Sequence, residues 1–191
     1  MTAGLVGLSS CSEEDATENE FDNWQQRNEE YVASLVSARS YDVRYKLYSL
    51  DESKEGAATD YVYVTVLESG DADGGSPMYT DSVRVSYQGR LIPTKTYPEG
   101  YVFDGTVFGN YDLSTTATAK FLPSSLVDGF TTALLHMHRG DRWRVSIPYQ
   151  LGYGSTVQSS IPAYSTLVFD IMLVDFSPAG ETMPVWSARR E

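Results

Sequence analysis

The 191-residue sequence predicts an α+β protein with an antiparallel β-sheet, one short α-helix and an additional amphipathic helix near the N-terminus. Two observations lead to this fold class. Segments of alternating apolar residues are interrupted once by a short helical pattern, and the order strands, helix, strands is typical of antiparallel α+β domains. The chain is also 41% hydrophobic and 13% aromatic, which is enough for one domain with a sizeable core.

The first element is a predicted amphipathic helix over residues 20–38. Thr17-Glu18-Asn19-Glu20 fits a capping box, in which the Thr oxygen and the Glu carboxylate satisfy backbone donors. Large residues then recur at roughly helical spacing: Phe21, Trp24, Asn28, Tyr31, Val32, Leu35 and Val36. The helix has two candidate roles, packing on the domain or forming a dimer contact or stalk.

Three strands are predicted before the second helix. Residues 41–50 alternate in the manner of a half-buried strand, and 61–69 (YVYVTVLES) follow after a polar linker. A turn-rich break separates these from a third strand at 81–91 (DSVRVSYQGRL). From there to residue 123 the chain reads as strand and turn.

The second helix is short and lies within residues 124–137 (SSLVDGFTTALLHM). We expect Ser125 to cap its start and Gly140 to end the turn after it. Its helical pattern consists of Leu126, Val127, Phe130, Leu134 and Leu135. Two further strands follow, RWRVSIPY at 142–149 and STLVFDIMLVDF at 165–176.

The connection between these last two strands is unusual for a loop. Glycine, serine and proline mark it as irregular structure, yet it carries bulky, partly apolar side chains: Tyr149, Leu151, Tyr153, Ile161 and Tyr164. Loops normally lie on the surface and often carry function. The composition therefore indicates that this loop covers something.

Composition and short motifs exclude several functions. A net charge of −12 argues against nucleic-acid binding, because phosphates would be repelled. The single cysteine allows neither an intrachain disulfide nor a thiolate metal cluster. His136 and His138 form an HxH pair with no evident third ligand, so no metal site is predicted. No G-x-S-x-G elbow is present, which disfavours a hydrolase.

The N-terminal segment ends in a candidate lipidation site. Leu8-Ser9-Ser10-Cys11 closes a small, apolar stretch and resembles the bacterial lipobox, which predicts lipid on Cys11. No Lys or Arg precedes the stretch, although signal peptides begin with positive charge, so we interpret residues 1–11 as part of a signal peptide. Ser12-Glu13-Glu14-Asp15 resembles an acidic surface-export signal of bacterial lipoproteins. A chance cysteine in an unstructured N-terminus is the alternative.

Four separated motifs carry a resemblance to a known family. In order, VSYQGRL, YVFDGT, LVDGFTTALLHMHRGDRWRVSIPYQLGYG and IPAYSTLVFDIMLVDF resemble the FKBP family of peptidyl-prolyl isomerases, over residues 60–177. The resemblance implies a twisted antiparallel sheet curled around one short helix, with a pocket between them. The predicted organisation is 1–11 partial lipoprotein signal peptide, 12–58 acidic tether, amphipathic helix and linker, 59–177 isomerase domain and 178–191 C-terminal tail.

The resemblance also implies the site residues. Those expected to be catalytic are Tyr87, Phe103, Asp104, Val127 and Tyr153. Those expected to bind substrate are Leu126, Phe130, Ile161 and Phe169. The Val127 N–H would face the substrate carbonyl, and the loop bearing Tyr153 and Ile161 would wall the pocket. The chain departs from the family pattern in four ways: Phe130 replaces the usual Trp, Ala119 replaces an aromatic wall, no arginine matches the usual partner of Asp104, and IPTKTYPEG lengthens one hairpin.

The main hypothesis is an isomerase that accelerates X–Pro isomerisation in folding envelope proteins. This chemistry breaks no covalent bond and requires no cofactor. The partners would be proline-containing polypeptides, a macrolide inhibitor and, through lipid on Cys11, a membrane. The location would be the bacterial cell envelope, where the protein would be an outer-membrane lipoprotein facing either the periplasm or the cell surface. The alternatives are an FKBP-like chaperone or peptide-binding lipoprotein with little or no isomerase activity, and a structural lipoprotein with a vestigial pocket.

Overall fold

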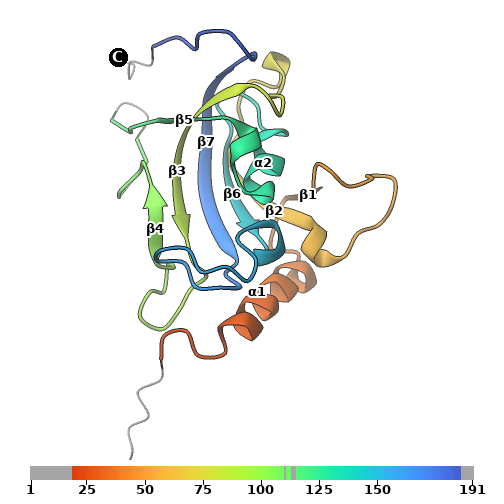
Figure 1. Cartoon of the computed structure of the whole chain (residues 1–191), viewed down its shortest axis with the longest axis vertical. Helices are drawn as coiled ribbons and strands as arrows, with labels where there is room; N and C mark the ends of the chain where they lie inside the picture. Colours follow the sequence, from red (N-terminus) through yellow and green to blue (C-terminus); the bar gives the residue numbers. More distant parts are fainter. Residues whose placement is uncertain (1–18, 110, 113–114, 186–191) are drawn as a thin grey trace, which may run out of the picture.

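The computed structural model describes residues 19–109, 111–112 and 115–185 (Figure 1). Over these residues the chain forms one seven-stranded antiparallel sheet in the order β1-β2-β6-β7-β3-β4, with β5 also paired to β3. The strands are β1 Val43–Lys46, β2 Tyr61–Glu68, β3 Ser82–Arg90, β4 Val102–Gly105, β5 Ala119–Phe121, β6 Arg142–Ile147 and β7 Leu167–Ser177. The helices are α1 Trp24–Ala38 and α2 Asp128–Leu134. The predicted α+β class is therefore confirmed.

The two faces of the sheet differ because side chains alternate along each strand. β3 pairs with β7 from Ser82↔Ser177 to Arg90↔Val168. One face presents buried apolar residues to α2: Val62, Val64, Val83, Val85, Tyr87, Trp143, Val145, Ile147, Leu167, Phe169, Ile171 and Leu173. The opposite face of the two long central strands carries polar residues, among them Ser86, Gln88 and Asp170.

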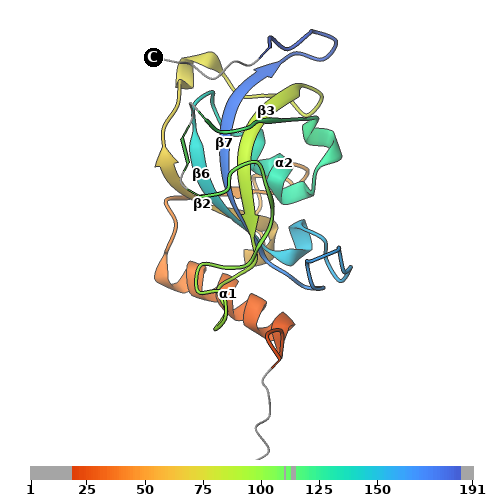
Figure 2. The same ribbon diagram turned by 90° about the vertical axis from the view of Figure 1, so that its left-hand side faces the viewer.

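Helix α2 lies against the apolar face of the sheet (Figure 2). Its Phe130, Ala133 and Leu134 are all less than 5% exposed. Gly129 sets the distance of approach, since a Cβ there would lie 2.2 Å from Ile147 Cγ2 on β6. Only a glycine lets the first turn of the helix reach the sheet this closely.

Helix α1 begins four residues later than the predicted start at residue 20. Residues 19–22 form a turn that is closed by the Asp22 N–H on the Asn19 carbonyl at 2.9 Å. Asn23 then adopts a left-handed conformation (φ 51°) and provides no side-chain cap. The predicted start was wrong for this reason, and Thr17 and Glu18 of the proposed capping box lie outside the described residues.

Helix α1 packs on the sheet, as one of its two predicted roles required. Trp24 belongs to the main core, and Val32 packs against Tyr61 and Tyr63 of β2. In both views α1 lies at the end of the sheet opposite the C-terminal end of β7 (Figures 1 and 2). The domain boundary predicted between residues 58 and 59 stays a prediction. Both α1 and β1 precede this boundary, yet both contact strands of the sheet that follow it.

Two further local predictions were wrong. The strand predicted at 41–50 is limited to β1, because a turn closed by the Leu50 N–H on the Leu47 carbonyl follows it. Ser125 does not cap α2, since it lies in a 3₁₀ turn and donates instead to the Leu122 carbonyl at 2.8 Å. Gly140 does occupy a turn with positive φ, as predicted.

No helix in the described part of the chain is both long and apolar enough to cross a membrane. Cys11 and the acidic run after it lie outside the described residues, so the lipidation hypothesis stays a prediction.

Candidate active site

Four of the predicted site residues form one aromatic cluster between the sheet and α2. Phe130 of α2 stands edge-on to Phe169 of β7, with ring centroids 4.9 Å apart. Phe103 of β4 meets Phe169 at 5.5 Å, and Tyr87 of β3 meets Phe130 at 6.1 Å, both with near-perpendicular rings. Such edge-to-face contacts stabilise aromatic pairs beyond simple burial. The cluster forms an apolar surface contributed by three strands and a helix.

Gly89 makes this arrangement of rings possible. It lies on β3 between Asp104 of β4 and Phe169 of β7 in the strand register. A Cβ at this position would lie 2.5 Å from Phe169 Cε1 and 2.7 Å from Phe103 Cε2. Glycine inside a strand usually marks a close approach of neighbouring groups. The rings of Phe103 and Phe169 occupy the space that a side chain at position 89 would need.

The main polar feature of the cluster is a hydrogen bond between Tyr87 and Asp104. The Tyr87 hydroxyl donates to Asp104 Oδ2 at 2.8 Å, and the other carboxylate oxygen accepts the Gly105 N–H at 2.8 Å. Burial, followed by the hydrogen bond to Asp104, raises the pKa of Tyr87 well above its usual range. Tyr87 is therefore a neutral hydroxyl at physiological pH. Within the described residues no arginine pairs with Asp104.

Leu126 and Val127 lie at the entrance to α2. Both are half-buried and pack against the core cluster that contains Phe130. Val127 is the residue before the helix, in an extended conformation, and its carbonyl accepts the Thr131 N–H at 3.0 Å. The Val127 N–H itself donates no hydrogen bond within the described part of the chain. A free N–H beside an apolar cluster is a donor that can hold a carbonyl oxygen.

The loop between β6 and β7 contributes Tyr153 and Ile161. Ile161 is 7% exposed and belongs to the core cluster, whereas Tyr153 is 38% exposed. Tyr153 lies close enough to Tyr87 to contribute electrostatically to the raised pKa of Tyr87. The loop is closed on itself by the Tyr164 N–H, which donates to the Gly154 carbonyl at 2.8 Å. All nine predicted site residues thus lie on elements that border the aromatic cluster.

One aromatic neighbour was missed by the sequence analysis. The ring of Phe121 on β5 lies 5.8 Å from that of Tyr87. Ala119 and Phe121 share a face of β5 because they are two residues apart. Although Ala119 leaves one position of the wall without an aromatic ring, Phe121 supplies a ring beside it. The alternation in Ala119–Phe121 was the signal available in the sequence.

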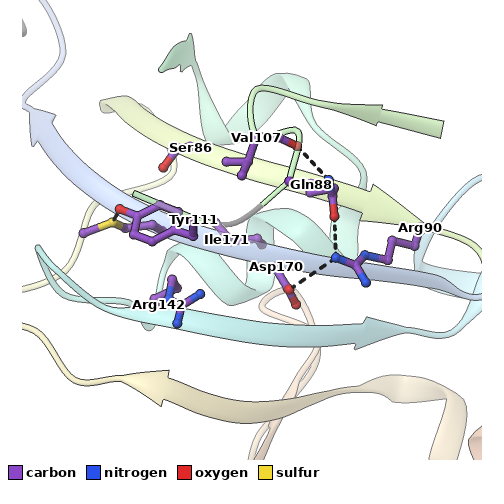
Figure 3. Close-up of a pocket in the computed structure, with 10 residues that line it drawn as sticks. Ser86, Gln88, Arg90, Val107, Tyr111, Arg142, Asp170 and Ile171 are labelled. Atoms are coloured by element: carbon purple, nitrogen blue, oxygen red, sulfur yellow. Dashed lines mark hydrogen bonds and ion pairs between the residues drawn. The ribbon is translucent and has the colours of Figure 1, made fainter. Parts of the chain in front are cut away.

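A cavity of about 170 Å³ lies on the opposite face of the sheet (Figure 3). Its lining residues are Ser86, Gln88, Arg90, Val107, Gly109, Tyr111, Arg142, Asp170, Ile171 and Met172. The charged groups here are already paired: Asp170 binds Arg144 at 2.7 Å, and Arg90 contacts Asp170 at 3.9 Å. None of the nine predicted site residues lines this cavity. We therefore place the candidate site at the aromatic cluster, where an apolar surface meets the Val127 N–H, unpaired within the described residues.

The two histidines have local partners. His136 Nδ1 lies 2.8 Å from the Thr132 carbonyl, and its ring stacks on Tyr45 at 4.1 Å. His138 Nδ1 lies 3.3 Å from Asp141 Oδ2. In the ranges that the structure describes, no group of three potential ligands could hold a metal ion.

Comparison with known proteins agrees with this geometry. Residues 74–174 match the family described as FKBP-type peptidyl-prolyl cis-trans isomerase. The chain is 38% identical over 107 residues to the macrophage infectivity potentiator of Trypanosoma cruzi, covering 56% of this chain and 48% of that protein. It is 36% identical over 104 residues to the FKBP-type 22 kDa peptidyl-prolyl cis-trans isomerase of Escherichia coli, covering 54% of this chain and 45% of that protein.

A solved structure shares the fold. The crystal structure of a peptidyl-prolyl cis-trans isomerase from Pseudomonas syringae superposes with a TM-score of 0.59 at 24% identity, covering 85% of this chain and 99% of that chain. The chain belongs to the FKBP-type peptidyl-prolyl cis-trans isomerase family, and the resemblance seen in the four motifs is confirmed. It spans about half the length of the curated relatives it matches.

Proposed function

We propose that this protein accelerates cis–trans isomerisation of X–Pro peptide bonds. The aromatic cluster at Gly89, joined to the neutral Tyr87 hydroxyl, is the observation that carries the proposal. It combines a large apolar surface with few polar groups, which is the composition expected of a small-molecule or peptide site. Proline is the residue that such a surface suits, since its ring is apolar and its nitrogen has no hydrogen to satisfy.

The chemistry follows from the amide bond. Resonance gives the bond a rotation barrier of roughly 18–20 kcal/mol, and uncatalysed X–Pro isomerisation takes tens of seconds or more. The twisted transition state has lost most of its C–N double-bond character and charge separation. A surface poor in water therefore favours it over the planar ground state. About 100 turnovers per second would require a barrier lower by roughly 5–6 kcal/mol.

Each predicted residue has a distinct role in this proposal. Phe103, Phe130 and Phe169 would hold the proline ring, with Leu126 and Ile161 closing its sides. The free N–H of Val127 would hold the substrate carbonyl oxygen, and the Tyr153 hydroxyl would orient the peptide at the rim. Tyr87 and Asp104 would hold each other in place through their hydrogen bond, at the edge of the apolar surface.

The decisive experiment is a protease-free assay of cis–trans relaxation on a short X–Pro peptide, with and without a macrolide inhibitor. We expect the protein to increase the relaxation rate in proportion to its concentration and the inhibitor to abolish the increase. A rate equal to that in buffer alone would contradict isomerase activity.

A binding module is the second candidate function. Phe130 is smaller than the tryptophan expected there, Ala119 leaves part of the wall open, and Asp104 has no arginine partner within the described residues. A wider, less ordered site would bind peptides while twisting them poorly. Peptide binding measured by calorimetry, together with relaxation at the buffer rate, would favour this function over catalysis.

The cellular setting is a separate part of the proposal. Curated relatives occur in Escherichia coli and Haemophilus influenzae, which supports a bacterial setting. Together with the lipobox pattern ending at Cys11, this supports a lipid-anchored protein that acts on envelope proteins. Stable anchoring requires about two acyl chains. Mass spectrometry of the membrane fraction should therefore find a diacylated or triacylated Cys11, and a free thiol on intact protein in the soluble fraction would contradict anchoring.

A further inference from the structure

Asn28 of helix α1 is a polar side chain with no exposed surface, and it binds a segment 138 residues away. Its Oδ1 accepts the Thr166 N–H at 2.7 Å, and its Nδ2 donates to the Trp24 carbonyl at 2.7 Å. Thr166 directly precedes β7, the strand that carries Phe169. A buried donor left without its partner is costly. Asn28 therefore determines where the backbone enters this strand.

Trp24 makes a second connection to the same segment. Its indole N–H donates to Ser165 Oγ at 2.8 Å, and the Ser165 hydroxyl donates in turn to the Pro162 carbonyl at 2.7 Å. Trp24 is 6% exposed, so this chain of hydrogen bonds is shielded from water at its start. Hydrogen bonds in such a shielded series strengthen one another.

Helix α1 also contacts the other end of the loop. The hydroxyl of Tyr149, near the start of the loop, donates to Glu29 Oε1 at 3.1 Å. The Tyr149 ring in turn packs edge-on against Tyr164 near the loop's end, with centroids 5.3 Å apart. One helix thus binds both ends of residues 148–166, and Figure 1 shows α1 directly beside this loop.

The loop needs such support because its backbone is unfavourable in places. Tyr164 and Ser159 have positive φ values of 62° and 36°, conformations that non-glycine residues seldom adopt without help from their surroundings. Between the two anchored ends lie Tyr153 and Ile161, both assigned to the candidate site. Their position relative to Phe169 depends on how the loop is held.

We propose that Asn28 and Trp24 are positioning residues, which hold the loop at 148–166 against the sheet in the conformation that walls the substrate site. The inference rests on the proposed function for its effect on catalysis, but its structural part can be tested independently. Neither residue contacts the aromatic cluster through a hydrogen bond. Both act through Ser165 and Thr166.

The experiment compares Asn28→Ala and Trp24→Phe with Val32→Ala in the full chain. Asn28→Ala removes both side-chain hydrogen bonds, whereas Trp24→Phe keeps an aromatic ring but replaces the indole, with its N–H donor, by a smaller phenyl ring. Val32→Ala is the matched control, since Val32 lies on the buried face of the same helix but packs on Tyr61 and Tyr63, away from the loop. If Asn28→Ala fails to fold, Trp24→Phe and Ser165→Ala test the same connection more mildly.

Hydrogen exchange measured by mass spectrometry is the readout that does not depend on activity. In Asn28→Ala and Trp24→Phe, amides at 151–166 should exchange about three- to tenfold faster than in the wild type, as expected for one or two lost hydrogen bonds. Val32→Ala should leave exchange in this loop unchanged while lowering the melting temperature. Equal exchange in all four proteins, or equally faster exchange in Val32→Ala, would overturn the positioning role.

The kinetic readout separates this inference from the proposed function. With an X–Pro peptide, the loop variants should raise KM about three- to tenfold and change kcat less than twofold, because the loosened wall binds substrate less well. Val32→Ala should keep the wild-type KM. Faster loop exchange with an unchanged KM would overturn the effect on the site. A wild type without activity would contradict the proposed function and leave the exchange result to decide the positioning role.

Discussion

Gly89→Ala is the substitution that tests the candidate site most directly. The added Cβ would lie 2.5 Å from Phe169 Cε1 and 2.7 Å from Phe103 Cε2, whereas carbon atoms prefer about 3.5–4.0 Å. Both rings must therefore move by about 1 Å. They cannot do so freely, because β3 is hydrogen-bonded to β4 on one side and β7 on the other. Overpacking of this kind typically costs about 1–3 kcal/mol of unfolding free energy.

For a chain of this length, each kcal/mol lowers the melting temperature by about 2–4 °C. We therefore expect Gly89→Ala to melt about 2–12 °C below the wild type, and to relax X–Pro peptides more slowly because the displaced rings narrow the proline site. Thermal unfolding followed by circular dichroism measures the first effect, and the protease-free assay measures the second.

Gly74→Ala is the matched control for this change. Its Cβ would meet Asp71 Oδ2 at 3.5 Å, an ordinary contact, and Gly74 does not have a positive φ. Replacing a glycine in an unstrained position usually stabilises by about 0.4–1 kcal/mol, through the unfolded state. A Gly89→Ala protein as stable and as active as the wild type, or an equal loss in Gly74→Ala, would refute the packing role assigned to Gly89.

Three further predictions address the polar and apolar parts of the site. Tyr153→Phe should lower kcat/KM about two- to tenfold, consistent with one lost hydrogen bond. The melting temperature of the protein should stay constant, because Tyr153 is exposed. Phe130→Ala should cost about 3–5 kcal/mol in urea denaturation, since the buried ring leaves a cavity; a loss below 1 kcal/mol would contradict its place in the core. Because the pKa of Tyr87 is raised in the folded protein, its contribution is present below about pH 10 and lost as pH rises further. The free energy of unfolding by which the wild type exceeds Tyr87→Phe should therefore shrink above pH 10. If this difference in unfolding free energy stays constant with pH, the pKa of the Tyr87 hydroxyl is not raised by burial.

Much of the fold was accessible from local patterns. The β-branched and aromatic residues of YVYVTVLES, and the alternation of apolar with polar residues in DSVRVSYQGRL, identified β2 and β3 to within one residue at each end. Helix ends were harder to locate. The start of α1 depends on the left-handed conformation of Asn23, and the start of α2 on a 3₁₀ turn at Pro123–Ser125, neither of which has a periodic signature.

What the sequence indicated by itself was the family, through four motifs that resemble it, and the presence of a loop too apolar to be an ordinary connection. The candidate site residues were implied by that resemblance and stay a prediction. Only the tertiary structure decided what the loop rests on. The hydrogen bonds of Asn28 with Thr166 and of Trp24 with Ser165 join residues more than 130 positions apart, and their partners are a backbone N–H and a serine that carry no pairing signal. The same holds for Gly89, whose missing side chain has meaning only once the rings of Phe103 and Phe169 are brought over it by two neighbouring strands.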